Sequence, residues 1–457
     1  MDRCRWLLAA VLVALLAACG AEGPIRTSSS EPSPATSVAP LPAFAADSER
    51  IADHLAALQA IATEHGGNRF AGTSGYEASV DWAVGVLVEL GFEVDTPEVA
   101  FTGFAELPGT ELVVGASTFT GPDELRALIY SPGGEVTARV EILDDSGCAA
   151  GDFDGLERGM IVLTVESGCF RRQQAINAVE AGAAALLVGY PGRGPGEIFR
   201  PTLIDPAGIE IPVLSVTHDA VRALEGAGDE TVRLSVNTER EPAVLRNVIA
   251  QLGDGPRVVM VGAHLDSVLE GPGINDNGSG VASVLEIARG VAEAGVPAGT
   301  AVRIGLWGGE ELGLVGSRAY VEDLEDDLVA YINLDMTGSL NGANLVYDEV
   351  AVAEGSAQIT QAFVDWFTDR GQRVEPADLG GGSDHGPFNE AGIPTGGLFA
   401  GATETGGAAA PSASGARGEP ADACYHLACD DIDNVDVGRA ALFADASLAI
   451  ALGLISD

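Results

Sequence analysis

The residue types that could do chemistry gather in the second half of the chain, beginning with the stretch 258–280, VVMVGAHLDSVLEGPGINDNGSG. Its apolar opening, 258–262, is typical of a buried strand of a parallel sheet, although so short a run could also be buried helix. His264 and Asp266 follow directly, and Asp276 lies in the loop beyond. Ligand sites of open α/β sheets lie outside the carboxyl ends of such strands. His264 and Asp276 are therefore predicted to lie at that edge.

Further ligand types follow the ends of later predicted strands. Segment 302–307 runs into Gly-Gly-Glu310-Glu311, segment 329–334 ends at Asp335, and a Gly/Ala-rich loop leads to CYHLAC with Tyr425 and His426. Two imidazoles and three carboxylates, with a spare glutamate, are what a pair of Zn²⁺ ions needs, because zinc takes nitrogen and oxygen ligands. Adjacent glutamates point in different directions, so one can bind metal while the other addresses a bound water.

The remaining histidines have fewer potential partners for metal binding or catalysis near them in the sequence. His54 and His65 lie in the first predicted helix region without companions, and His218 has only Asp219 beside it. We expect all three to be surface residues. His385 stands in the sequence SDHGPF, next to Asp384.

Composition excludes some classes of function. The formal net charge is −43 and the pI is about 4.2, which argues against a nucleic-acid partner because such partners need a basic face. The chain has no Lys, so Schiff-base and lysine-nucleophile chemistry are excluded. The acidity itself is typical of a secreted protein from a source with an acidic, Gly/Ala-rich bias.

The N-terminus is predicted to be an export signal, residues 1–18. Arg3 and Arg5 precede an apolar run, 6–18, that is shorter than the roughly 20 residues a membrane-spanning helix needs. The sequence Leu-Ala-Ala-Cys19 resembles the lipobox of bacterial lipoproteins, so we expect a lipidated Cys19 and a flexible tether over 19–46. The alternative is an ordinary cleaved signal with Cys19 incidental. The protein is thus predicted to be extracytoplasmic, lipid-anchored to the cell membrane or else secreted.

Four further cysteines, Cys148, Cys169, Cys424 and Cys429, would face an oxidising exterior, where pairing is expected. Three connectivities are possible, and the wide gap between the two clusters favours Cys148–Cys169 with Cys424–Cys429. Zinc binding by these thiols is less favoured because no C-x-x-C spacing occurs.

Hydrophobic periodicity predicts a discontinuous α/β domain, 47–111 and 237–457, interrupted by a β-rich insertion, 112–236. Strands that alternate with helices indicate a mixed, mostly parallel sheet flanked by helices. In the α/β domain the predicted helices are 48–65, 76–90, 280–294 and 356–371, and the predicted strands are 92–101, 245–251, 258–262, 302–307 and 329–334. In the insertion the predicted strands are 136–143, 160–165, 184–188 and 213–216, with one helix, 173–181.

Several motifs in their order resemble a known family. GAHLDSV, GPGINDNGSG, LWGGEELGLVGS, NLDM, SDHGPF and CYHLACD are similar to signatures of the M28 family of co-catalytic zinc aminopeptidases, and most similar to the secreted aminopeptidases of Streptomyces. The resemblance spans the α/β domain and implies a zinc-peptidase (phosphorylase/hydrolase-like) fold. CFRRQQAINAVEAGAAALLVGY followed by IPVLSV resembles the protease-associated (PA) domain found in or beside exported peptidases.

The resemblance implies roles for individual residues. His264 and Asp335 would bind one zinc, His426 and Glu311 the other, with Asp276 bridging the two. Glu310 would be the general base.

The resemblance also implies supporting roles around the metals. Asp266 would hold His264 in its ligating orientation, and Tyr425 would donate a hydrogen bond to the developing oxyanion. The Cys424–Cys429 disulfide would fix Tyr425 and His426. Asp384 and His385 match the family motif as pocket or supporting groups. Gly382 stands where Streptomyces relatives carry Arg, so substrate recognition there is expected to differ.

The predicted function is an exported lipoprotein metalloaminopeptidase with two Zn²⁺ per chain. It would act as a monomer on peptide or protein N-termini, with membrane contact only through its lipid. The alternative is a carboxypeptidase or a glutaminyl-cyclase-like enzyme on the same scaffold. Cyclases use one zinc, whereas all five ligand positions are filled here, and a carboxypeptidase needs a cation that only Arg could supply. A binding protein with a dead site would be expected to lack ligands, and none is missing.

Overall fold

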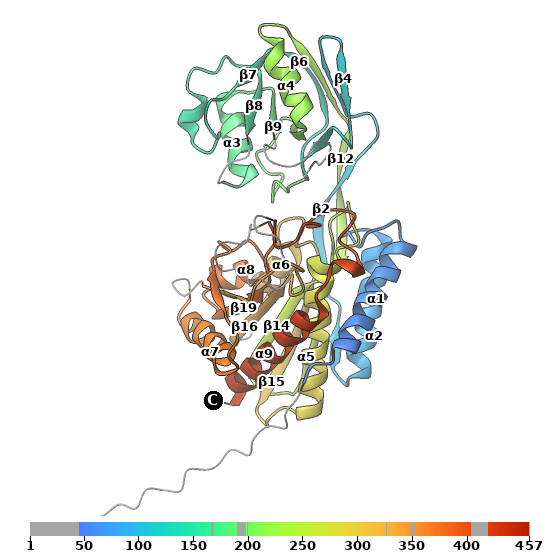
Figure 1. The fold of residues 1–457 in the computed structure, drawn as a ribbon, viewed down its shortest axis with the longest axis vertical. Helices are drawn as coiled ribbons and strands as arrows, with labels where there is room; N and C mark the ends of the chain where they lie inside the picture. The colour runs from blue at the N-terminus through green and yellow to red at the C-terminus, as the bar shows by residue number, and fades with distance from the viewer. Residues whose placement is uncertain are drawn as a thin grey trace, which may run out of the picture. The chain divides into compact units, whose positions relative to one another are not determined.

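The structure is a computed structural model that describes residues 45–165, 169–189, 198, 200–325, 327–348, 353–403 and 419–456. The predicted signal, Cys19 and nearly all of the tether lie outside these residues. The described chain comprises an α/β domain and an insertion within it (Figure 1).

An eight-stranded mixed sheet forms the centre of the α/β domain. Its strands, in spatial order, are β1 (Glu93–Asp95), β13 (Val248–Leu252), β15 (Thr300–Trp307), β14 (Arg257–His264), β16 (Leu328–Asp335), β19 (Thr395–Phe399), β17 (Leu345–Tyr347) and β18 (Glu375–Ala377). The four central strands, from β15 to β19, run parallel, while β13 and β17 pair antiparallel to them. The predicted mixed sheet is confirmed.

Helices cover both faces of this sheet, as a sheet with parallel central strands requires. Val259 and Val261 of β14 belong to the large core that also contains residues of α5 and α9, whereas Val258 and Met260 face a second cluster. That cluster includes Trp307 and residues of α6 and α8. The helices of this domain are α1 (Ser48–Glu64), α2 (Ser74–Glu89), α5 (Gly280–Ala294), α6 (Val315–Glu322), α7 (Ser356–Asp369), α8 (His385–Glu390) and α9 (Val437–Ser456).

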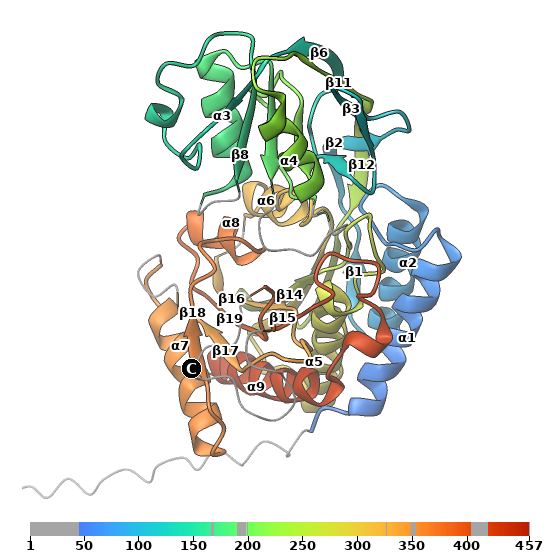
Figure 2. The same ribbon diagram turned by 45° about the horizontal axis from the view of Figure 1, so that its top comes forward.

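Among the described residues, α9 is the one helix long and apolar enough to cross a membrane. Figures 1 and 2 show it lying against the sheet beside α5. Phe443, Ala444 and Ala451 on it are fully buried. Its apolar composition is therefore explained by its place in the core.

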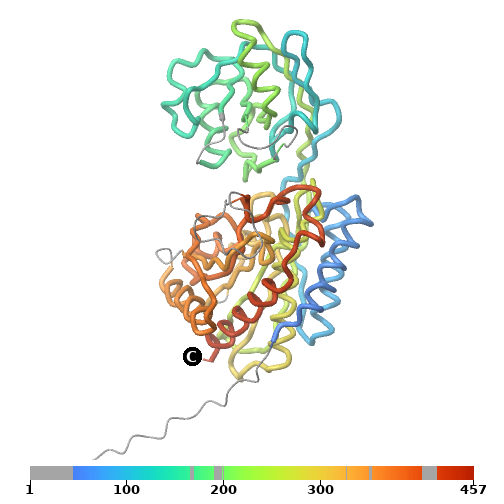
Figure 3. The backbone as a smooth tube through the Cα atoms, in the orientation of Figure 1, coloured from blue at the N-terminus to red at the C-terminus, as the bar shows by residue number. Residues whose placement is uncertain are grey.

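Two predicted strands are each broken in two. Segment 92–101 splits at Pro97 into β1 and β2 (Glu98–Glu106), and 245–251 splits at Asn247 into β12 (Thr238–Arg246) and β13. The breaks lie opposite each other, because the Asn247 amide donates to the Pro97 carbonyl at 3.1 Å. Beyond them β2 and β12 leave the main sheet as a two-stranded antiparallel ribbon that leads into the insertion and back (Figures 1 and 3).

The insertion contains two sheets. The first has the order β5-β10-β9-β8-β7, with β7 to β10 parallel, and the second has the antiparallel order β4-β3-β11-β6. Predicted strand 136–143 breaks at Arg139 and contributes to both, and α4 is a helix that was not predicted. The elements are β3 (Glu111–Val114), β4 (Ser117–Thr120), β5 (Leu125–Ala127), β6 (Gly134–Ala138), β7 (Val140–Ile142), η1 (Ala150–Phe153), β8 (Ile161–Val165), α3 (Arg171–Ala181), β9 (Ala185–Gly189), β10 (Val213–Val216), α4 (His218–Ala227) and β11 (Val232–Val236).

Candidate metal centre

Neighbouring parallel strands deliver the predicted ligands to one edge of the sheet. β14 ends at His264 and the adjacent β16 ends at Asp335. β15, on the other side of β14, ends at Trp307 and leads into Glu310 and Glu311. Because these strands are parallel, their carboxyl ends meet at the same edge.

Asp276 lies between the two histidines. It belongs to the short turn η2 (Ile274–Ser279), which precedes α5. Its Oδ1 atom is 3.1 Å from His264 Nε2, and its Oδ2 atom is 3.1 Å from His426 Nε2. Each imidazole nitrogen faces a second carboxylate as well, Asp335 at 3.5 Å from His264 and Glu311 at 3.2 Å from His426. The arrangement is two groups of one imidazole and two carboxylates that share Asp276.

These distances fit metal ions. Ligand atoms about 2.0–2.1 Å from a tetrahedral zinc lie about 3.3 Å from one another, which is the range observed here. His264, Asp276 and Glu311 alone offer three ligand atoms within 4.8 Å of one another. Glu311 Oε1 and Asp335 Oδ1 are buried and accept no hydrogen bond within the described chain, so both are available to a cation.

The electrostatics of the centre also favour added positive charge. Burial raises the pKa of Glu311 to about 7, although His426 opposes the shift, and burial raises the pKa of Glu310 well above its usual range. The pKa of Asp276 is lowered, because His264 and His426 together outweigh its burial. A buried excess of carboxylates is costly unless cations compensate it. Bound metal ions would provide that compensation.

The Asp266 carboxylate lies where it can hold the turn that carries the two glutamates. Its oxygens accept from the backbone amides of Glu310 at 3.2 Å and Glu311 at 3.4 Å. The carboxylate is 3.7 Å from His264 Nδ1, which is too long for a hydrogen bond, whereas the Asp266 carbonyl oxygen is 3.2 Å from that nitrogen. Asp266 thus contacts His264 through its backbone and fixes Glu310 and Glu311 through its side chain.

Tyr425 and His426 come from a loop closed by the Cys424–Cys429 disulfide. Their rings stack with centroids 3.9 Å apart. His426 has φ of +58°, a left-handed conformation that is uncommon outside glycine. The second disulfide joins Cys148 to Cys169 in the insertion. The structure therefore forms the two disulfides that the sequence favoured.

The SDHGPF segment lies beneath the centre. Ser383 Oγ donates to Asp335 Oδ2 at 2.7 Å, leaving Oδ1 directed at His264. Asp384 is fully buried, and burial raises the pKa of its carboxyl to about 7. The His385 ring packs against Tyr347, with centroids 4.6 Å apart. Of these, the contact between Ser383 and Asp335 was not predicted.

Two further residues that sequence reasoning missed hold the loops of the centre. Arg69, from the turn after α1, is completely buried and donates to the carbonyls of Leu265, Pro272 and Gly273. Burial lowers its pKa to about 10. Asp430 accepts from the backbone amides of Asn275 and Asp276 at 2.8 and 3.0 Å. Asp430 ends the CYHLACD motif, which could have pointed to it, whereas Arg69 stands in no local pattern that indicates its role.

The histidines without predicted chemistry lie elsewhere. His54 is half-buried with its ring against Trp82, at 5.7 Å between centroids. His65 is partly exposed, and its Nδ1 lies 2.9 Å from Ser74 Oγ. His218 is half-buried at the start of α4 in the insertion.

A cavity of about 550 Å³ opens over the centre, within the ~300–1,000 Å³ typical of ligand pockets. Residues of the α/β domain and of the insertion line it together. From the α/β domain come Glu310, Glu311, Gly313, Leu314, Arg318, Gly380, Gly381, Gly382, Glu390, Tyr425 and His426, and from the insertion come Cys169, Phe170, Arg171, Arg200, Pro201, Thr202 and Ile204.

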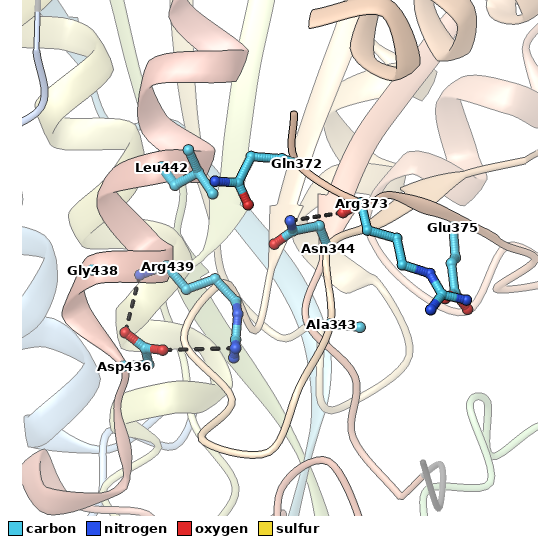
Figure 4. A pocket seen from close by; sticks show the side chains of 9 residues that line it. All are labelled: Ala343, Asn344, Gln372, Arg373, Glu375, Asp436, Gly438, Arg439 and Leu442. Atoms are coloured by element: carbon cyan, nitrogen blue, oxygen red, sulfur yellow. Dashed lines mark hydrogen bonds and ion pairs between the residues drawn. The ribbon is translucent and has the colours of Figure 1, made fainter. Parts of the chain in front are cut away.

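A second cavity, of about 320 Å³, lies near the start of α9 (Figure 4). Asp436 accepts from the Arg439 amide there, and the Asn344 side chain donates to the Arg373 carbonyl. Arg373 is paired with Glu375 at 2.8 Å. None of the predicted site residues lines this cavity, and its charges are balanced, so the catalytic candidate is the cavity over the metal centre.

Known proteins resemble this chain along most of its length. The model of peptidase family M28 matches residues 247–451, and the PA domain model matches 133–224. The chain is 40% identical over 431 residues to the probable lipoprotein aminopeptidase LpqL of Mycobacterium tuberculosis, covering 88% of this chain and 84% of that protein. It is 36% identical over 426 residues to an aminopeptidase of Pseudomonas aeruginosa, covering 87% and 78%.

Solved structures share the fold. An aminopeptidase from Aneurinibacillus sp. strain AM-1 superposes with a TM-score of 0.71 at 24% identity, over 89% of this chain and 93% of that one. A zinc aminopeptidase from Bacillus subtilis gives 0.69 at 24% identity, over 90% and 95%. At this identity the likeness establishes the fold alone.

Proposed function

Because the chain belongs to peptidase family M28, we propose that it is an exported zinc aminopeptidase that removes N-terminal residues from peptides. Two Zn²⁺ ions would be held by His264, Asp335, His426 and Glu311, with Asp276 shared. The observation that carries this proposal is the position of Asp276, whose two oxygens each lie 3.1 Å from a different imidazole nitrogen.

Glu310 is the proposed general base. Its backbone amide is fixed by Asp266, it lines the cavity, and its carboxyl is not among the close contacts of the two histidines. Bound zinc supplies Lewis-acid polarisation of the scissile carbonyl and acidifies a water. Glu310 would take a proton from that water and deliver it to the leaving amine. Tyr425, beside His426 in the cavity, would donate a hydrogen bond to the carbonyl oxygen as it gains charge.

Charge in the cavity favours binding of an amino end over a carboxyl end. Glu310 and Glu311 line it. Two of the arginines that line it are already neutralised, Arg318 by Glu390 at 2.7 Å and Arg200 by Glu106 at 2.6 Å. A carboxypeptidase would need a cation for the substrate carboxylate, so these ion pairs weigh against that alternative.

Attachment to the membrane through a lipidated Cys19 is part of the proposal. The M. tuberculosis relative is named a lipoprotein aminopeptidase and matches along most of this chain. The sequence around Cys19 supports the same processing. Alanine at Cys19 should release the protein from membranes into the medium, which fractionation with an immunoblot would measure.

The activity is tested with leucine amide and its N-acetyl derivative. The protein should release leucine from the free amine and leave the acetylated compound intact, because the carboxylates that line the cavity favour an ammonium group. Turnover of the blocked compound in preference to the free one would refute an aminopeptidase.

A further inference from the structure

The insertion contributes a wall to the cavity over the metal centre, and one residue of that wall is unusual. Phe170 is 62% exposed although it is a large aromatic residue. Isolated exposed apolar side chains are normal on protein surfaces. Among the exposed large hydrophobic residues of the described chain, however, Phe170 alone lines the cavity that contains Glu310 and His426.

The backbone at Phe170 is held from both sides. Cys169 before it is tied to Cys148 by the disulfide, and Phe170 itself precedes the first turn of α3. Arg171 Nη1 donates to the Cys169 carbonyl at 3.3 Å. A fixed backbone lowers the entropy lost when the ring binds a partner.

The insertion is also docked closely on the α/β domain next to the catalytic turn. Gly313 has φ of +109°, and a Cβ there would come within 2.5 Å of the Ile204 carbonyl oxygen. Arg200 pairs with Glu270 at 3.2 Å, and Arg126 pairs with the same carboxylate. Glu270 lies in the loop between Asp266 and Asp276. Ile204 therefore lies at a defined position relative to the metal centre, and Phe170 lines the same cavity.

The cavity has a buried acidic side and an exposed apolar side. Glu311 is 6% exposed and Phe170 is 62% exposed, and both line it. An enzyme that cleaves the first peptide bond holds the first residue beside the carboxylates of the metal centre, so the residues after the scissile bond extend away from them toward solvent.

We propose that Phe170 and Ile204 of the insertion form an apolar subsite for the substrate side chain that follows the scissile bond. This inference rests on the proposed aminopeptidase function and names the substrate class within it. The enzyme would prefer peptides whose second residue is aromatic or aliphatic over those with glycine there.

The test compares two substrates, Leu-Phe-Gly and Leu-Gly-Gly, by the leucine released from each. The ratio of their kcat/KM values should fall about tenfold in Phe170→Ala and recover in part in Phe170→Leu, since an aliphatic side chain restores some of the contact. Ile142→Ala, which removes another exposed apolar residue of the insertion that does not line the cavity, should leave the ratio unchanged.

An unchanged ratio in Phe170→Ala, or an equal loss on both substrates, would overturn the subsite. Equal loss would mean that Phe170 only supports the fold of the insertion. Failure of the wild-type protein to release leucine from either peptide would instead refute the proposed function, and leucine amide distinguishes the two failures because it has no second residue.

Discussion

Parallel strands occur both in the main sheet and in the insertion, but the buried polar groups near them behave differently. In the insertion, Asn177 donates to the Gly147 carbonyl at 3.0 Å and Thr164 donates to the Ser146 carbonyl at 2.9 Å. In the main sheet, Asp276, Glu311 and Asp335 face imidazoles, and two of their oxygens accept no hydrogen bond within the described chain.

The difference separates polar groups that serve folding from those that serve chemistry. In the insertion, backbone carbonyls accept from Asn177 and Thr164, as most buried polar groups in proteins are satisfied. Its unpartnered buried groups within the described chain include the neutral hydroxyls of Ser215 and Thr217, whereas those at the edge of the main sheet include carboxylate oxygens.

At the edge of the main sheet, the pKa of Asp276 is lowered by the two histidines and the pKa of Glu311 is raised by burial. Perturbed pKa values of this kind are typical of functional sites. The parallel topology places the carboxyl ends of neighbouring strands at one edge of the sheet. The side chains at those strand ends then determine whether that edge can bind metal.

The largest expected effect is on turnover in Glu310→Gln. The variant should keep about two zincs per chain and lose about 10²–10⁴-fold in kcat on leucine amide, because amide nitrogen cannot accept the proton. Glu293→Gln, which removes an exposed carboxylate paired with Arg289, is the matched control. A Glu310→Gln variant with near wild-type kcat would disprove the base assignment.

Metal removal should affect the α/β domain more than the insertion. Chelation leaves the buried carboxylates uncompensated, and loss of tightly bound ligands lowers the melting temperature by roughly 10 °C. Hydrogen exchange measured by mass spectrometry should speed up in the loops 265–276 and 424–430, and change little in β8, β9 and β10. Equal acceleration in both regions would mean that the metal centre and the insertion are not independent in stability.

Arg69→Gln should destabilise the α/β domain by about 2–4 kcal/mol, since three buried carbonyls lose their charged donor. Arg50→Gln is the control, because Arg50 is 58% exposed and pairs loosely with Asp47 at 3.6 Å, an interaction worth about 0–1 kcal/mol. Urea unfolding followed by fluorescence measures both. Similar losses in the two variants would show that Arg69 has no special structural role.

The smallest effect is expected within the insertion. Asn177→Ala removes the hydrogen bond to the Gly147 carbonyl and the one that Asn177 Oδ1 accepts from Gln173, and it should cost about 1–2 kcal/mol of stability. Hydrolysis of leucine amide should stay within about twofold of wild type, because distant sites act independently. A large fall in kcat at unchanged stability would mean that this hydrogen bond also serves the chemistry.

Local patterns in the sequence predict the ligand-bearing strand ends well. Periodicity indicates helix 280–294 at the bounds the structure has, and the motifs around His264, Asp276 and Glu311 carry the site. The rest depends on contacts between distant segments. Pro97 and Asn247 break two predicted strands because they meet across the ribbon, and Arg69 reaches a loop about two hundred residues away. Single-sequence patterns contain no signal for such contacts.

The contact between Ile204 and Gly313 is another one that the sequence does not predict. It depends on how the insertion docks on the α/β domain, and no local pattern near either residue indicates it. The PA-like motif predicted that an insertion exists, whereas its contribution to the cavity became visible only in three dimensions.

Asp276 is proposed to bind both zincs, and zinc stoichiometry tests that assignment most directly. Elemental mass spectrometry of the dialysed protein should find about two zincs per chain in the wild type and fewer than one in Asp276→Ala, because both metal positions lose a ligand at once. A variant that still holds two zincs, or a wild-type chain that holds only one, would contradict it.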